Sequence, residues 1–390
     1  MINLSKRLIS AIRKVAGKKK VLFLHEPSLG IEEAKNLKEC IKTNMVSSFG
    51  PFVEKFEKSI SSFTKSKYAI STINGTSALH IALKVIGLRE KEEVLIPALN
   101  YIASTNATLY CDGIPHFVDI NKQDLGIDVE KLEEYLKKNT KLVKNKLINK
   151  LSKNTIRAVI PTHVYGNPMD LGKLSHLCKR YNLKIIEDAT EAVGSKYKNK
   201  HLGTIGDVGT LSFNGNKIIT TGGGGMILVN NIKQSNLARH LTTVAREKSK
   251  FFIGHDMIGY NYKLPNINAA LGYAQIKKIH RLIKLKRQLN QRYANEFLKI
   301  PEVEVLKEKK GSRSNYWLNT IILKGNNYKY RDRIISESHR NNIFIRPAWR
   351  CLSQLKYLKN FPRMNLSNTI NLQKRILNLP SSPHLVSKKS

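Results

Sequence analysis

Apolar positions in the middle of the chain alternate between two periods. Short apolar runs of strand length lie at residues 94–96, 116–118, 158–160, 184–186 and 226–229. Stretches with helical spacing separate these runs, and Leu79, Leu83 and Ile86 form one such helical face. This alternation predicts an α/β fold with a mostly parallel sheet that helices cover on both sides. In such sheets ligands bind at the carboxyl ends of the strands.

A different pattern opens the chain. Apolar residues recur at helical spacing among lysines and arginines: Leu4, Leu8, Ile12 and Val15. Residues 1–24 are therefore interpreted as a basic amphipathic N-terminal segment. Two uses of its apolar stripe are open. The stripe packs on this protein or on a partner subunit, or residues 1–20 make peripheral contact with a membrane surface.

The pattern changes again near Pro265, where a helix is expected over residues 267–297 and a shorter mixed region follows it. A chain of 390 residues exceeds the usual size of one domain. We therefore expect a large cofactor-binding domain over residues 25–265 and a small C-terminal α+β domain over residues 266–390. Within the large domain, residues 138–154 are polar and basic without clear periodicity, which predicts a surface excursion.

Charge is the most unusual feature of the composition. The formal net charge of +38 fits either a polyanion partner or a general enrichment in lysine along the chain. No glycine-aromatic RNA-binding signature or zinc-finger spacing accompanies the charge, so nucleic acid is disfavoured as a partner. Four widely separated cysteines predict free thiols, no metal site and a reducing compartment. Without a secretory signal pattern or a membrane-length apolar run, the expected location is the cytoplasm.

Two segments place polar groups at the ends of expected strands. Residues 74–79, Asn-Gly-Thr-Ser-Ala-Leu, stand between a strand and a helix, where backbone N–H groups and hydroxyls can hold a phosphate. An N-cap turn without a ligand explains the same residues. Glu187 and Asp188 end a buried strand. A carboxylate there can pair with a protonated pyridine nitrogen, or the two residues form a solvated acidic turn.

The third segment runs from Ser212 to Lys217 and is followed by four consecutive glycines at residues 222–225. Such a tract costs backbone entropy, and the close approach of a bulky ligand would explain it. A lysine among uncharged neighbours can have a lowered pKa and act as a Schiff-base nucleophile. Any one lysine of so basic a chain can equally be a surface residue. The glycine tract and Ser212 favour the nucleophile for Lys217.

In this order the three segments resemble those of fold-type I pyridoxal-phosphate (PLP) enzymes. The detailed resemblance is to the DegT/DnrJ/EryC1/StrS family of sugar aminotransferases and covers about residues 25–383. Its strongest stretches are residues 49–56, 74–80, 187–189, 212–217 and 259–262. The resemblance implies PLP as the cofactor and a fold-type I architecture with a large and a small domain.

The resemblance also implies roles for individual residues. Lys217 matches the lysine that bonds to the cofactor and moves the proton, and Asp188 matches the residue paired with the pyridine nitrogen. Glu191 stands where many members have glutamine beside the ring hydroxyl. The other implied cofactor contacts are Gly75, Thr76, Ser77 and Ser212 at the phosphate, Tyr101 stacked on the ring, His163, and Asn261 from the neighbouring subunit of a homodimer. The implied substrate contacts are Lys263, where members usually have arginine, Tyr316 and Arg346.

The implied reaction moves an amino group from an amino acid, usually L-glutamate, to a keto carbon of a nucleotide-linked sugar. Residues 25–27, 44–48 and 214–216 resemble a subgroup whose acceptor is a UDP-linked 2-acetamido-4-keto-6-deoxy sugar, used for surface glycans. Two alternatives stay open. A PLP-dependent sugar dehydratase would carry histidine in place of Lys217, and a non-catalytic nucleic-acid-binding regulator on this fold would usually carry an appended helix-turn-helix domain.

Overall fold

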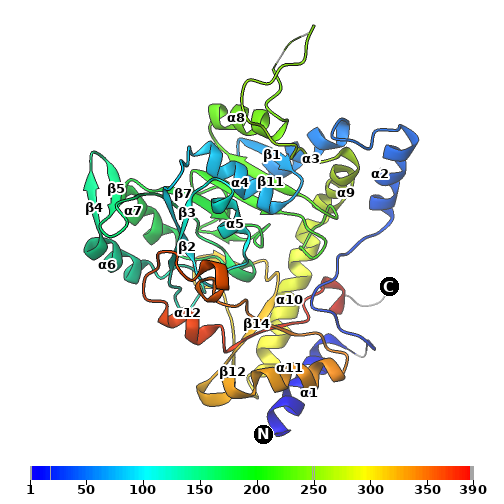
Figure 1. Ribbon diagram of the computed structural model, residues 1–390. Coiled ribbons are helices and arrows are strands. Elements are labelled where there is room, and N and C mark those ends of the chain that lie inside the picture. Colours follow the sequence, from blue (N-terminus) through cyan, green and yellow to red (C-terminus); the bar gives the residue numbers. More distant parts are fainter. Residues whose placement is uncertain (1, 18, 248, 250, 387–390) are drawn as a thin grey trace.

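A nine-stranded sheet forms the centre of the larger lobe in the computed structural model, which describes residues 2–17, 19–247, 249 and 251–386 (Figure 1). Seven strands cross it in the order β1-β11-β10-β7-β6-β2-β3. Their bounds are β1 (Tyr68–Thr72), β2 (Glu93–Pro97), β3 (Ile114–Val118), β6 (Thr155–Val159), β7 (Lys184–Asp188), β10 (Val208–Ser212) and β11 (Gly225–Val229). Neighbours from β10 to β3 are parallel, and β11 is antiparallel to β1 and β10. The sheet is thus mixed and mostly parallel along this order.

Strand β11 is reversed because a loop, and not a crossover helix, joins it to β10. β10 ends at Ser212 and β11 begins at Gly225, and these two residues face each other across the pair. The connection between them therefore stays at the carboxyl end of β10. Because this edge of a parallel sheet is where ligands bind, the loop of residues 213–224 lies over the expected binding edge.

The basic stretch at residues 138–154 holds two further strands of the sheet, which the sequence pattern did not predict. β4 (Thr140–Val143) and β5 (Lys146–Asn149) form an antiparallel hairpin, and β5 also pairs with β6. The turn between them has positive φ at Lys144 (47°) and Asn145 (61°), as two-residue hairpin turns require. Each strand has only four residues, and the apolar Leu142 and Val143 are exposed, so no clear alternation of buried apolar and exposed polar positions marks the strands in the sequence.

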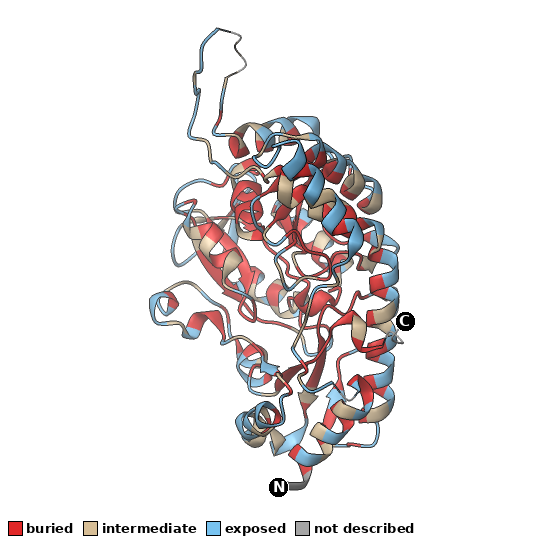
Figure 2. Cartoon of the chain, turned by 90° about the vertical axis from the view of Figure 1, so that its right-hand side faces the viewer, coloured by how far each residue is buried: buried red, intermediate tan, exposed pale blue. Residues whose placement is uncertain are grey.

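Helices cover the sheet and bury its apolar residues. Figure 2 shows buried residues along the strands and the inner helix faces, and exposed residues on the outward faces. α4 is buried along nearly its whole length, and most of its residues are apolar or small. The helices of this lobe are α2 (Ile31–Lys42), α3 (Pro51–Thr64), α4 (Gly75–Val85), α5 (Ala103–Leu109), α6 (Val129–Asn139), α7 (Leu171–Tyr181), α8 (Ile232–Thr242) and α9 (Asn266–Lys277).

The second lobe begins with the long helix α10 (Ile279–Phe297) and holds a four-stranded antiparallel sheet, while α9 packs on α2 and α3 of the first lobe. The helix predicted over residues 267–297 is two helices, α9 and α10, because the backbone at Lys278 leaves the helical conformation. The sheet has the order β12-β14-β16-β15. Its strands are β12 (Val303–Val305), β14 (Asn319–Leu323), β15 (Arg346–Pro347) and β16 (Ile376–Leu379), and the remaining helices are α11 (Arg331–Arg340) and α12 (Ser367–Leu372).

The N-terminal helix α1 (Ile2–Ala16) packs onto this second lobe. Its apolar stripe is buried against α10, where it meets Leu289, Tyr293 and Phe297. Burial of each large aliphatic side chain stabilises the folded state by roughly 1.5–3 kcal/mol. Because the stripe is buried against the second lobe, it is not available to a membrane in this structure. Among the described residues no helix combines the length and apolarity that a bilayer crossing requires. Residues 1 and 18 of the predicted segment, and 387–390 of the predicted small domain, lie outside the described residues.

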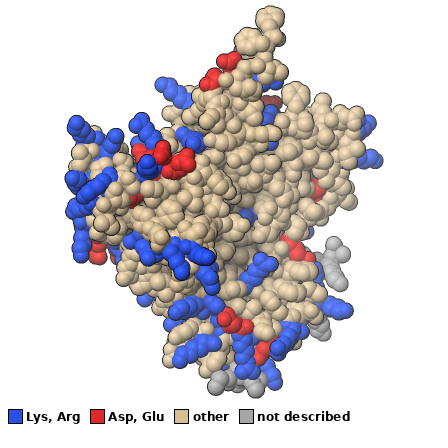
Figure 3. Space-filling model, viewed as in Figure 1, with Lys and Arg blue, Asp and Glu red and all other residues tan. Residues whose placement is uncertain are grey.

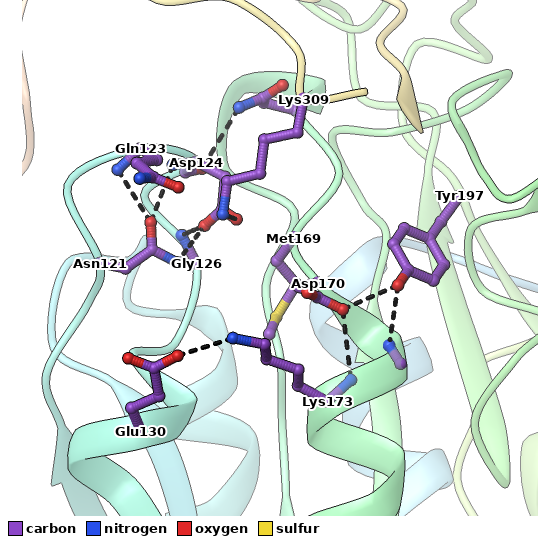
Figure 4. A network of polar contacts seen from close by, with 12 residues as sticks. Asn121, Gln123, Asp124, Gly126, Glu130, Met169, Asp170, Lys173, Tyr197 and Lys309 are labelled. Atoms are coloured by element: carbon purple, nitrogen blue, oxygen red, sulfur yellow. Dashed lines mark hydrogen bonds and ion pairs between the residues drawn. The ribbon is translucent and has the colours of Figure 1, made fainter. Parts of the chain in front are cut away.

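A three-stranded sheet and a polar network connect the two lobes. β13 (Ser312–Arg313) pairs with β8 (Lys196–Tyr197), which pairs with β9 (Lys200–His201). Beside it, the Nζ of Lys309 lies 2.6 Å from Oδ2 of the buried Asp124, whose other oxygen accepts from the Gly126 N–H at 2.9 Å (Figure 4). These contacts hold the second lobe against the carboxyl edge of the central sheet.

Candidate active site

A cavity of about 780 Å³ lies between the carboxyl edge of the central sheet and the second lobe. This volume is within the usual range for cofactor and small-ligand sites. Eight of the residues predicted from the sequence line it: Gly75, Thr76, Tyr101, Asp188, Glu191, Ser212, Lys217 and Arg346. They come from segments more than 250 residues apart, which the fold brings together.

The glycines after Lys217 allow the loop to pack against the chain itself. A Cβ added to Gly225 would lie 2.3 Å from the carbonyl oxygen of Asn74, and one added to Gly224 would lie 2.1 Å from Oγ1 of Thr221. Gly222 has a φ of 79°, where glycine is favoured. The expectation of a bulky ligand against these glycines is therefore corrected for Gly224 and Gly225, which approach protein atoms and not a ligand.

Lys217 projects from this loop into a largely buried environment. Its Nζ lies 3.7 Å from Oε1 of Glu191 and 3.8 Å from the centre of the Trp317 ring. The indole N–H of Trp317 donates to the carbonyl of Asn216 at 2.8 Å, which fixes the ring beside the amine. Burial lowers the pKa of Lys217, and the carboxylates of Glu191 and Asp188 oppose this shift. The amine is thus closer to its neutral, nucleophilic form than an exposed lysine.

Asp188 stands at the carboxyl end of β7, beside Thr210 of the parallel strand β10. Its Oδ2 accepts from the hydroxyl of Ser104 at 2.7 Å, and its Oδ1 accepts from the hydroxyl of Thr190 at 2.6 Å. These two donors hold the carboxylate in one orientation in the cavity. Because strand side chains alternate, the preceding Glu187 points to the opposite side and accepts from the Gly203 N–H at 2.8 Å.

Glu191 is the second carboxyl group of the cavity. Its Oε2 accepts from the backbone N–H of Tyr165 at 2.7 Å, and Oε1 faces Lys217. Burial raises the pKa of Glu191 to about 7, although the nearby lysine and the Tyr165 N–H favour the ionised form. The carboxyl group of Glu191 therefore changes charge near neutral pH. The glutamine that is common at this position in the resembling enzymes has no such titration.

The start of α4 forms an anion cradle at the other end of the cavity. The side chain of Asn74 caps the helix by accepting from the Ser77 N–H at 2.8 Å. Gly75 lies against Ser212, since a Cβ there would be 3.0 Å from the Ser212 Cβ. Backbone N–H groups at a helix start, with the hydroxyls of Thr76 and Ser212, suit a phosphate monoester. The Ser77 N–H, predicted as a phosphate contact, is already used by Asn74.

Besides Ser77, four predicted site residues are not among the residues that line the cavity of this chain. His163 is fully buried and its Nε2 lies 3.3 Å from Glu187, so its imidazole is a structural contact. Tyr316 has a φ of 47°, and its hydroxyl accepts from the Glu308 N–H at 3.4 Å away from the cavity. Lys263 lines a separate depression with Arg239. Asn261 is exposed beside Thr243, and its predicted contact with a neighbouring subunit stays a prediction.

Other lining residues were not predicted as site residues. Trp317 belongs to the Tyr316-Trp317 stretch, of which only Tyr316 is predicted as a substrate contact. In the structure Trp317 lines the cavity, and Tyr316 has a left-handed backbone that local sequence does not show. Ser104 is 84 positions from Asp188, and no spacing rule connects them. Trp349 completes the aromatic wall, with its ring stacked on Tyr165 at 5.0 Å between centroids.

The fold and this arrangement define a PLP-dependent aminotransferase architecture. The structure is similar to an aminotransferase of Helicobacter pylori involved in pseudoaminic acid biosynthesis, with a TM-score of 0.84 over 93% of this chain and 94% of that chain at 22% identity. Residues 27–390 match the DegT/DnrJ/EryC1/StrS aminotransferase family, and the chain belongs to this family. Aminotransferases of the family use PLP.

Two relatives refine this placement. The chain is 35% identical to the GDP-perosamine synthase of Vibrio cholerae, over 93% of this chain and 94% of the relative. It is 30% identical to the UDP-4-amino-4,6-dideoxy-N-acetyl-beta-L-altrosamine transaminase of Campylobacter jejuni, over 85% of both chains. The chain is a sugar aminotransferase of this family, and its relatives are named for different nucleotides.

Proposed function

We propose that this protein transfers an amino group from an amino acid, with L-glutamate as the expected donor, to the 4-keto carbon of a nucleotide-linked 4-keto-6-deoxy sugar. One observation carries the proposal. A buried lysine amine, a firmly held carboxylate and a helix N-terminus face one cavity, at Lys217, Asp188 and Gly75. These are the three chemical groups that PLP requires, and the residues therefore fit this cofactor.

In the proposed mechanism each residue has a separate task. When bound, PLP supplies a carbon that accepts an amine and a ring that withdraws electrons from the substrate carbon. Lys217 holds the cofactor, then acts as the base that moves a proton at the substrate carbon through Nζ. Asp188 keeps the pyridine nitrogen protonated, and Thr76 with Ser212 anchors the phosphate. Tyr101, which is 56% exposed and lines the cavity, would stack on the ring.

For the acceptor we propose a UDP-linked 2-acetamido-4-keto-6-deoxy sugar, with a GDP-linked 4-keto-6-deoxy sugar as the second candidate. The Campylobacter jejuni transaminase supports the first, and the GDP-perosamine synthase, at 35% identity, favours the second. The test is to aminate the holoenzyme with glutamate, remove the donor, and add each keto sugar separately. The true acceptor restores the original cofactor spectrum and yields an amino sugar by mass spectrometry. If neither sugar restores the original cofactor spectrum, the proposal is contradicted.

We also propose that the active protein is a homodimer. Between α8 and α9 the chain extends away from the body, and large apolar side chains there are exposed: Phe251 (95%), Ile258 (81%), Ile253 (67%) and Phe252 (64%) (Figure 1). Apolar residues at this density on a projecting segment mark an association surface. Asn261 follows this segment, and the dimer would carry it toward the cavity of the neighbouring subunit.

Neither alternative function receives support from the site. A dehydratase would replace the lysine of position 217, and here that lysine is present beside Glu191. Figure 3 shows lysines and arginines over several separate elements of the visible face, without one continuous basic stripe for a nucleic acid. The positive charge instead suits a diphosphate-containing substrate.

Replacement of Glu191 by glutamine should change how the attachment of PLP to Lys217 depends on pH. Ionised Glu191 stabilises the ammonium form of Lys217 and so raises the lysine pKa. Because the pKa of Glu191 is about 7, this influence exists only above about pH 7. In Glu191→Gln, neutral amine should therefore be available at lower pH. The expected result is that the rate of covalent PLP attachment to apoenzyme, followed by stopped-flow absorbance, reaches its maximum at lower pH.

The matched control for this experiment is Glu130→Gln, which removes an exposed carboxylate outside the cavity. Its pH profile should be that of the wild-type protein. Superimposable profiles for Glu191→Gln and wild type above pH 7 would contradict the assigned coupling between Glu191 and Lys217.

A further inference from the structure

Two phenylalanine rings stack in the wall of the cavity. The centroids of Phe23 and Phe344 are 5.6 Å apart, and the ring planes are within 11° of parallel. Both residues line the cavity, yet Phe23 remains 49% exposed. Large aromatic side chains usually bury most of their surface. A stacked pair with one open face is therefore a surface on which a further flat ring can stack.

The backbone, and not the rings, holds this pair in place. Leu22 and Ile343 pair as a parallel bridge. The N–H of Leu22 donates to the carbonyl of Asn342, and the N–H of Phe344 donates to the carbonyl of Leu22, both at 2.8 Å. The side chains of Leu22 and Ile343 are buried in the core of the second lobe. Phe23 is thus positioned by its neighbours, and its own ring contributes little to the core.

The segment that carries Phe344 also places a cation in the cavity wall. Ile343 and Ile345 are buried, while Phe344 and Arg346 both line the cavity. The Ile345 N–H donates to the carbonyl of Ile343 at 3.1 Å, so the backbone turns tightly at Phe344 before β15 begins at Arg346. Within the part of the chain that the structure describes, no carboxylate is recorded as an ion-pair partner of the Arg346 guanidinium. An aromatic platform with an unpaired guanidinium beside it matches a base next to phosphates.

We propose that Phe23 and Phe344 form a stacking platform for the nucleobase of the substrate, with Arg346 at its diphosphate. This inference rests on the proposed function and deepens it, because it locates the nucleotide end of the acceptor. The proposal gives the order of the substrate's parts along the cavity: the base lies on the aromatic pair, the diphosphate lies at Arg346, and the keto sugar extends toward Lys217. Stacking tolerates any base, so the platform provides affinity while the contacts around it select the nucleotide.

The test measures binding of free nucleotides to PLP-loaded enzyme by calorimetry, with UDP, GDP and inorganic pyrophosphate as probes. Phe23→Ala should weaken binding of the preferred nucleotide about ten- to a hundredfold. It should leave pyrophosphate binding unchanged, since pyrophosphate has no base to stack. Phe23→Tyr keeps a flat ring and should bind the nucleotide within about twofold of wild type. Arg346→Gln should weaken both the nucleotide and pyrophosphate.

If Phe23→Ala binds both UDP and GDP as tightly as the wild-type enzyme does, the proposed platform is wrong. The platform is also wrong if the wild-type enzyme binds neither nucleotide. A loss of pyrophosphate binding in Phe23→Ala would also overturn it, because a disturbed cavity would then explain the effect. These outcomes are separate from the proposed function. The amination of the cofactor by glutamate needs no nucleotide, so it tests the transaminase chemistry whether or not the platform exists.

Discussion

Lys217→Ala is expected to abolish both halves of the transamination reaction and the absorbance of covalently bound PLP. The variant lacks the only lysine amine that lines the cavity of the described chain, so nothing remains to bond the cofactor or to move the proton at the substrate carbon. Proton transfer by a positioned side chain alone contributes about 10²–10⁴-fold in rate. The measurements are absorbance spectra after PLP addition and single-turnover rates with glutamate and with a keto sugar.

The matched control for this substitution is Lys233→Ala, which removes an exposed lysine of α8. It should load PLP and turn over like wild type. Thermal unfolding of the two variants separates a chemical defect from a folding defect, because removal of Lys217 leaves the buried Glu191 without its ion-pair partner and can lower stability as well as activity. Turnover and a covalently attached cofactor in Lys217→Ala would refute the assigned site.

Asp188→Asn is expected to lower kcat/KM by about 10²–10³-fold while PLP still attaches to Lys217. The amide keeps the shape of the carboxylate and one acceptor oxygen for Thr190, while its NH2 group faces the hydroxyl of Ser104, which must turn to accept. It has no charge to keep the pyridine nitrogen protonated. Loss of one preorganised electrostatic contact in an active site typically costs this factor. The experiment combines steady-state kinetics with absorbance spectra of the bound cofactor, which report on covalent attachment separately from turnover.

The neighbouring carboxylate offers the control for this prediction. Glu187 accepts backbone N–H groups, including that of Gly203, on the other side of the strand from Asp188. Glu187→Gln should therefore lower the thermal unfolding midpoint, with a much smaller effect on the rate per folded enzyme. If the two variants lose activity equally after correction for folding, the assignment of Asp188 to the pyridine nitrogen is wrong.

Sequence patterns predicted the elements and residues whose signals are local. The runs at residues 94–96, 184–186 and 226–229 fall within strands β2, β7 and β11, because buried strands are short and uniformly apolar. Asp188 ends strand β7 and Lys217 follows strand β10, and the two strands are parallel neighbours. Their meeting at one edge of the sheet follows from strand direction, and the structure lines one cavity with both.

Predictions failed where a residue's environment comes from distant parts of the chain. The hairpin of β4 and β5 consists of four-residue strands, and β4 is exposed at apolar as well as polar positions, so the strand period does not appear in the sequence. The break at Lys278 divides a helix whose apolar pattern continues across it. In each case packing between elements, and not local sequence preference, decides the outcome.

The amino-acid sequence by itself thus determined the α/β fold, the family resemblance and the positions of Lys217 and Asp188, since each depends on residues close together in the chain. Only the tertiary structure decided that Trp317 flanks the lysine, that the glycine tract packs on the backbone of Asn74, and that Phe23 meets Phe344. These contacts join segments 100 or more positions apart. Their geometry is set by the packing of two lobes, which no local pattern of residues encodes.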